Sequence, residues 1–287
     1  MTAGSEPALE PTEPAQTGKG TPELEDDAFW YRYLTAGDPR ELALRKFFAH
    51  LPTSPRCSAC AAPFGGFGGP MMRMLGKGQS NINPRLCNAC FDYMRSHRGG
   101  AEITCSLMFA DVRGSTSLAE SMSATEFRAL MNRFYRVATR AIFDNDGSVD
   151  KFVGDEVMAM FFPLASGEEH PAEAVSAARQ LLEATGHSDP GGPWLPMGAG
   201  VHTGRAWVGA LGDEVHVELT AVGDAVNVTA RLASVAAAGE ILVSAETARA
   251  AGIEAGAVRR TVELKGKAEP VEVVPIVIGS KGERTAA

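Results

Sequence analysis

Two aspartates lie where acidic side chains can converge on a cation. Asp111 directly follows the apolar run 103–110, which has the length of a buried strand, and Asp155 lies between Gly154 and Glu156 in a predicted hairpin turn. If that turn lies beside the end of the first strand, the two carboxylates form a hard-oxygen site suited to Mg²⁺ or Mn²⁺. Taken singly, Asp111 could cap the following helix and Asp155 could be an ordinary turn residue.

An amide and a guanidinium share one face of a predicted helix. Gly223 and Asp224 indicate a helix start, so Asn227 and Arg231 lie four residues apart on the same side of that helix. Such a pair suits a sugar and a phosphate. A polar pair on a solvated helix face would have the same pattern, and the segment alone does not decide between them.

Four of the five cysteines form two CxxC pairs. Cys57 and Cys60 are separated by 26 residues from Cys87 and Cys90. Two such pairs are typical of a tetrahedral four-thiolate site, and we expect structural Zn²⁺ there. Iron is the main rival, because thiolates alone do not decide the metal. A redox dithiol is a weaker alternative, since neither pair lies in a βαβ context.

The chain divides into segments of different composition. Residues 1–27 hold seven acidic residues, four prolines and few large apolar side chains, so we expect a flexible tail. Residues 28–54 predict a short helical segment, and 280–287 a second flexible tail. Residues 55–98 form the four-cysteine module, with six Lys or Arg against one Asp. That module is too small for a core of its own, and bound metal should supply folding energy.

The main predicted domain covers residues 101–279. Apolar periodicity and turn signals predict helices over 124–142, 171–185 and 225–235. Strands are predicted over 103–110, 149–152, 157–162, 197–208, 215–221, 241–244, 262–264 and 271–278. Helices mixed with several hairpins indicate an α+β sandwich and not a regular βαβ succession.

Charge and hydropathy exclude several classes of protein. The balance of 27 Lys and Arg against 35 Asp and Glu argues against a surface built to coat nucleic acid or anionic membrane. No apolar run reaches the roughly 20 residues of a spanning helix, and the N-terminus does not resemble a signal peptide. We therefore expect a cytoplasmic protein without a membrane partner. The basic cysteine module lacks a recognisable DNA-reading helix, so nucleic acid is not an expected partner.

Four separated runs together resemble the catalytic domain of class III nucleotidyl cyclases. They occur in the family's order and at family-like spacing over about 101–279, and they are Leu107–Thr116, Lys151–Glu156, Val222–Leu232 and Leu264–Lys267. The resemblance implies a ferredoxin-like, palm-related α+β fold. It also implies that two catalytic domains pair head to tail and build active sites across their interface.

The same resemblance implies roles for individual residues. Asp111, Asp155 and the backbone carbonyl of Val112 would hold two Mg²⁺ or Mn²⁺ ions. From the partner chain, Asn227 would orient the ribose, and Arg231 would neutralise charge on the α-phosphoryl group in the transition state. Because one chain carries the complete set, we expect a homodimer with two equivalent sites.

Substrate contacts follow from the resemblance as well. Lys265 resembles the lysine that contacts the terminal phosphates. Lys151 would donate to adenine N1 and Thr220 would accept from the adenine amino group, which favours ATP and an adenylyl cyclase, a phosphorus–oxygen lyase of intracellular signalling. Thr220 replaces the aspartate of many members and can also donate, so a guanylyl or dual-specificity cyclase stays open. A catalytically silent nucleotide-binding module is the other alternative.

Overall fold

The computed structural model describes most of the chain. The described residues are 22–36, 39–50, 55–57, 60–81, 84, 86–97, 99–212, 217–255, 257–264 and 269–279. The first helix, α1 (Pro22–Thr35), includes the last six residues, 22–27, of the expected N-terminal tail. The rest of that tail and the expected tail 280–287 lie outside the described residues. Within the described ranges, no helix has the length and apolar character needed to cross a membrane.

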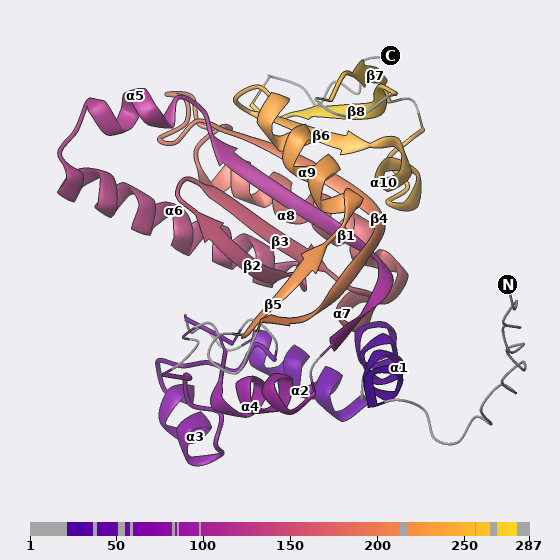
Figure 1. The fold of residues 1–287 in the computed structure, drawn as a ribbon. Coiled ribbons are helices and arrows are strands. Elements are labelled where there is room, and N and C mark those ends of the chain that lie inside the picture. The colour runs from indigo at the N-terminus through magenta and orange to yellow at the C-terminus, as the bar shows by residue number, and fades with distance from the viewer. Residues whose placement is uncertain are drawn as a thin grey trace, which may run out of the picture.

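A single sheet forms the centre of the part of the chain that the structure describes (Figure 1). Its order is β2-β3-β1-β4-β6-β8-β7, and β5 pairs with the second half of β4. β4 and β6 pair in parallel, whereas the other pairs are antiparallel. The strands are β1 (Gly99–Val112), β2 (Ser148–Val153), β3 (Glu156–Phe161), β4 (Met197–Gly212), β5 (Val217–Val222), β6 (Glu240–Ser244), β7 (Arg260–Val262) and β8 (Val271–Val277).

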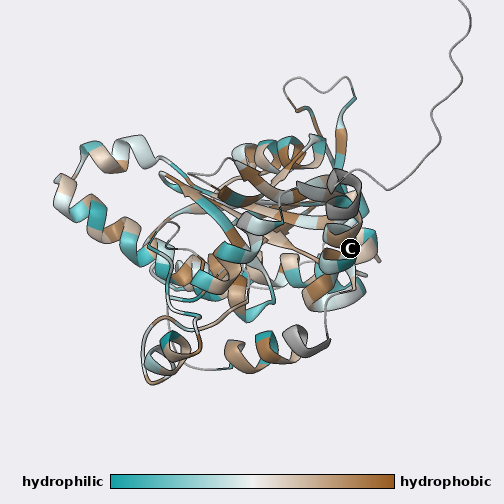
Figure 2. Cartoon of the chain, turned by 60° about the horizontal axis from the view of Figure 1, so that its bottom comes forward, coloured by the Kyte–Doolittle hydropathy of each residue, from teal (hydrophilic) through white to brown (hydrophobic). Residues whose placement is uncertain are grey.

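Helices cover both faces of this sheet, which confirms the predicted α+β class. The remaining helices are α2 (Pro39–Ala49), α3 (Gly68–Met74), α4 (Asn88–Ser96), α5 (Ser115–Glu120), α6 (Ala124–Asp144), α7 (Pro163–Ser166), α8 (His170–Ala184), α9 (Asp224–Val235) and α10 (Ala245–Ala250), with a 3-10 turn at Gly167–Glu169. α6 begins with a capping box in which Ser123 and Glu126 satisfy each other's backbone amides. Hydrophilic and hydrophobic residues alternate along α6, the long helix at the left of Figure 2.

Alternation along β1 assigns its side chains to the two faces. Met108, Ala110 and Val112 pack in the core beneath α6 and α8, and the alternate residues Leu107 and Phe109 belong to the core on the opposite face. By the same alternation, the Asp111 side chain lies on the face of Leu107 and Phe109. α9 lies on that same face, directly against β4, because a Cβ atom added at Gly200 would lie 2.4 Å from the backbone nitrogen of Ala233. Asp111 and α9 therefore share a face of the sheet.

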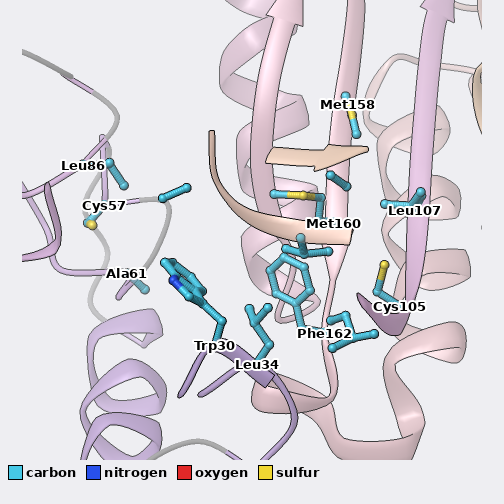
Figure 3. Close-up of a cluster of buried hydrophobic side chains, with 14 of the residues drawn as sticks. Trp30, Leu34, Cys57, Ala61, Leu86, Cys105, Leu107, Met158, Met160 and Phe162 are labelled. Carbon is cyan, nitrogen blue, oxygen red and sulfur yellow. The ribbon is translucent and has the colours of Figure 1, made fainter. Parts of the chain in front are cut away.

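The described N-terminal helices and the cysteine module share a core with this face of the sheet. In Figure 3, Trp30 and Leu34 of α1 lie between Cys57 of the module and Phe162 of the main domain. The Trp30 indole nitrogen donates to the His97 carbonyl at 3.1 Å. Because these buried side chains form one continuous cluster, the module and the sheet are expected to stabilise each other.

A buried arginine fastens α2 to the turn that precedes β2. Arg45 is 6% exposed. Its guanidinium donates to the carbonyls of Asp146 and Gly147, each at 3.1 Å. Asp146 adopts φ 54°, so the contact holds a turn in the left-handed region. β2 therefore starts from a position fixed by a residue about 100 positions earlier in the chain.

Candidate active site

The end of β1 and the tip of the β2–β3 hairpin meet at two of the predicted site residues. Asp111 pairs directly with Glu156 across the β1–β3 ladder. The Val112 amide donates to the Asp155 carbonyl at 3.3 Å. Gly154 at the hairpin tip has φ 61°, which favours glycine and permits the tight turn. The backbone thus brings Asp111, Val112 and Asp155 together.

Acidic charge is concentrated at this point. Burial raises the pKa of Asp111; the Arg113 guanidinium opposes this rise, and Asp155 adds to it. Burial together with the charges of Asp111 and Asp155 raises the pKa of Glu156 to about 7. Both pKa values are raised because the carboxylates are partly buried and repel one another. A divalent cation would offset this repulsion. The oxygen ligands and the excess negative charge therefore fit Mg²⁺ or Mn²⁺.

Arg113 connects the acidic cluster to α9. Its Nη2 lies 2.9 Å from Asp111 Oδ2. The same guanidinium donates to the carbonyls of Ala233 and Ser234 at 3.0 and 2.9 Å, in the last turn of α9. A cation at a helix C-terminus satisfies free carbonyls and interacts favourably with the helix dipole. The end of α9 is therefore held next to Asp111.

α9 presents Asn227 and Arg231 away from its buried side. Val228 and Leu232 are buried against the sheet, whereas Asn227 is exposed and Arg231 is half-buried. Among the described residues, neither the Asn227 amide nor the Arg231 guanidinium has a hydrogen-bond or ion-pair partner. Their polar groups are thus available to a ligand or to another chain.

The predicted base-reading residues converge on a carboxylate that sequence reasoning missed. Thr220 of β5 donates from Oγ1 to Oδ2 of Asp150 at 2.7 Å. Lys151 Nζ lies 3.5 Å from Asp150 Oδ1 and 3.1 Å from Glu218 Oε2. The register of β2 shifts between Val149 and Lys151, so Asp150 occupies a bulge in the ladder.

Two sequence signals could have pointed to this cluster. Asp150 is adjacent to Lys151, and strand alternation places Glu218 and Thr220 on the same side of β5. Neither signal reveals that the side chains of β5 reach β2, because β5 pairs with β4 and its contact with β2 is a tertiary contact between distant segments. The remaining predicted phosphate contact, Lys265, lies outside the described residues.

The four cysteines of the two CxxC pairs also come together. Their sulfur atoms all lie within 4.8 Å of one another. The Cys87 amide donates to Cys57 Sγ at 3.2 Å, and the Cys90 amide donates to Cys87 Sγ at 3.4 Å. Backbone amides that point at thiolate sulfurs are a common outer shell of metal ligands. The fifth cysteine, Cys105, is buried in β1, and burial raises the pKa of its thiol to about 12.

Residues 101–275 match the family model of the adenylate and guanylate cyclase catalytic domain. The chain belongs to this family. An adenylate cyclase of Dictyostelium discoideum, called terminal-differentiation specific, is 30% identical over 187 residues, which are 62% of this chain and 9% of that protein. The uncharacterized Mycobacterium tuberculosis protein Rv1320c is 32% identical over 184 residues, 62% of this chain and 32% of that protein. The chain thus matches about a third or less of the length of these relatives.

Solved structures of cyclases have the same fold. The guanylyl cyclase Cya2 is 28% identical, with a TM-score of 0.57 over 64% of this chain and 97% of that one. The adenylyl cyclase CyaB from P. aeruginosa is also 28% identical, with a TM-score of 0.57 over 65% of this chain and 99% of that one. Residues 101–275 are therefore a class III cyclase catalytic domain. Its neighbours are named for both nucleotides, so family membership does not choose between ATP and GTP.

Proposed function

We propose that this cyclase converts ATP to 3′,5′-cyclic AMP and pyrophosphate. The observation that carries the choice of ATP is the convergence of Lys151 and Thr220 on Asp150. The lysine offers a donor for adenine N1, and the hydroxyl offers an acceptor for the adenine amino group. A site that pairs with these groups would leave polar atoms unpaired if guanine entered, which is the basis of strong discrimination.

Asp111, Asp155 and the Val112 carbonyl would hold two divalent cations. When bound, Mg²⁺ or Mn²⁺ activates the ribose 3′-hydroxyl and neutralises charge on the triphosphate. Arg113 balances part of the charge of Asp111. Because Arg113 also donates to the Ala233 and Ser234 carbonyls, it would keep two acceptors if cations displaced it from Asp111.

Asn227 and Arg231 would act across the interface of a homodimer. Their lack of partners among the described residues supports this assignment, because no described side chain competes for either polar group. The Asn227 amide would orient the ribose. The Arg231 guanidinium would stabilise charge that develops on the α-phosphoryl group, and a fixed cation is most effective there in a partly desolvated site.

The experiment for this proposal is turnover of ATP and GTP by the purified chain with Mn²⁺. We expect formation of cyclic AMP with a higher kcat/KM than formation of cyclic GTP. A higher kcat/KM for GTP would favour the guanylyl alternative. Absence of both products from a sample shown to be dimeric would favour the silent module.

The four-thiolate cluster is proposed to hold one structural Zn²⁺ ion. Cys57 and Cys87 are fully buried in the core shared with Trp30, so the metal would stabilise the attachment of α1 to the sheet. A domain of this size obtains much of its folding free energy from its metal. Iron is the rival metal for the same four ligands.

Replacing Cys57 and Cys87 with serine should remove about one Zn²⁺ per chain and lower Tm by several degrees. The measurements are metal content by mass spectrometry and thermal unfolding by circular dichroism. Cys105→Ala is the matched control, because it removes a buried thiol outside the cluster. It should keep the metal. Unchanged zinc content in the double variant, or iron in the unmodified chain, would contradict the assignment.

A further inference from the structure

We propose that Asp150 is a positioning residue that fixes Thr220 as a hydrogen-bond acceptor and thereby selects adenine. This inference rests on the proposed function, because it concerns how the same site chooses its base. Thr220 by itself could donate to a guanine carbonyl or accept from an adenine amino group. Asp150 prevents donation to guanine, because it takes the Thr220 hydroxyl proton.

The geometry commits the Thr220 proton to Asp150. Thr220 Oγ1 lies 2.7 Å from Asp150 Oδ2, and the two residues are 5% and 3% exposed. A hydroxyl has one proton and two lone pairs, whereas an ionised carboxylate accepts only. The Thr220 hydroxyl must therefore donate to Asp150. What it can still offer to a nucleotide is a lone pair.

Lys151 supplies the complementary donor and balances the carboxylate. Its Nζ lies 3.5 Å from Asp150 Oδ1 and 3.1 Å from Glu218 Oε2. An ammonium has three donors, and Lys151 donates one of them to Glu218 Oε2, so the ammonium still has a donor for a ligand. Asp150 thus orients Thr220, and Glu218 holds Lys151. Lys151 is therefore the donor to the base, and Thr220 is the acceptor.

This donor and acceptor pair matches one purine. Adenine presents a ring acceptor at N1 beside an amino donor, and guanine presents a ring donor beside the O6 acceptor. With Thr220 held as an acceptor, guanine O6 would face a lone pair and guanine N1–H would face an ammonium. Buried polar groups without partners make such mismatches costly.

The bulge in β2 explains how Asp150 reaches Thr220. The bulge between Val149 and Lys151 takes Asp150 out of regular pairing with β3. Its side chain accepts from Thr220 of β5, which is 70 positions further along the chain. A contact between distant segments could also hold the fold together. The test must therefore separate base selection from stability.

The test compares kcat/KM for ATP and GTP in the full chain, in Asp150→Asn, in Thr220→Val and in the double variant. In Asp150→Asn the amide can donate to Thr220, which frees the hydroxyl proton for guanine O6. We expect the ATP-to-GTP ratio of kcat/KM to fall about tenfold. In the Thr220→Val background, Asp150→Asn should change the ratio less than about twofold, because no hydroxyl is left to orient.

Asp144→Asn is the matched control. It makes the same chemical change at a partly exposed residue of α6 and should leave the ratio unchanged. A merely structural role for Asp150 would lower turnover of both nucleotides by the same factor and would lower Tm. An unchanged ratio in Asp150→Asn, or an equal effect in the Thr220→Val background, would overturn the proposal while ATP cyclisation by the unmodified chain still stands.

Binding measurements keep this inference distinct from the proposed function. The probes are 3′-deoxy-ATP and 3′-deoxy-GTP, which lack the attacking hydroxyl and cannot cyclise. Calorimetry should show the same approximately tenfold loss of adenine preference in Asp150→Asn. If the unmodified chain is inactive but Asp150→Asn still loses adenine preference in binding, the proposed function fails and the base-selecting role is supported. If active protein shows no shift, the base-selecting role fails alone.

Discussion

Asp111→Asn is expected to reduce the rate of cyclisation about 10³-fold or more. The variant removes one of the carboxylates that would hold the divalent cations, and the charge stabilisation lost in the transition state amounts to several kcal/mol. The fold should tolerate the change. Burial raises the pKa of Asp111, so a neutral amide avoids the cost of a buried anion, although it loses the ion pair with Arg113.

The measurement is the Mn²⁺-dependent rate of cyclic AMP formation together with Tm. Asp144→Asn, which changes an aspartate outside the acidic cluster, serves as the control and should retain activity. Tm of Asp111→Asn should stay within a few degrees of the original value. Retention of a tenth or more of the activity would contradict the role assigned to Asp111.

Arg231→Ala is expected to lower kcat about 10²-fold while ATP affinity changes much less. An arginine that acts on charge formed in the transition state contributes little to ground-state binding. Because the guanidinium has no partner among the described residues, its removal should not disturb the fold. Steady-state kinetics with ATP separates the effects on kcat and KM.

The matched control for this variant is Arg128→Ala. Arg128 is an exposed arginine of α6, outside the proposed site, and its removal should leave kcat unchanged. A large rise in KM with preserved kcat in Arg231→Ala would mean that the residue binds substrate without stabilising the transition state. That result would contradict its assigned role.

Local sequence patterns predicted much of the main domain. The capping box and apolar spacing indicated α6, which the structure extends to Asp144, and the apolar run before Asp111 indicated β1. The short helices α5 and α10 were not predicted, because six residues hold too few apolar positions to show helical periodicity. The attachment of Arg45 to the turn before β2 was also missed, since it depends on tertiary packing.

The candidate site also combines features that the sequence predicts with features that depend on tertiary contacts. Strand spacing predicts the β2–β3 hairpin that carries Asp155, whereas its meeting with Asp111 depends on the pairing of β3 with the distant β1. Lys151 and Thr220 came from the family resemblance. The contribution of Asp150 could not be predicted, because it requires both a bulge in β2 and the approach of β5. Local patterns specify elements, whereas contacts between distant segments decide which polar groups meet.

The central claim is that each active site combines acids of one chain with the Asn227 and Arg231 face of its partner. The direct measurement mixes Asp111→Asn with Arg231→Ala protein after dissociation and reassociation. Half of the dimers formed at equal mixing are heterodimers with one intact composite site, so the mixture should regain about one quarter of the original activity. A mixture no more active than its separate components, with heterodimers demonstrated by native mass spectrometry, would contradict the shared site.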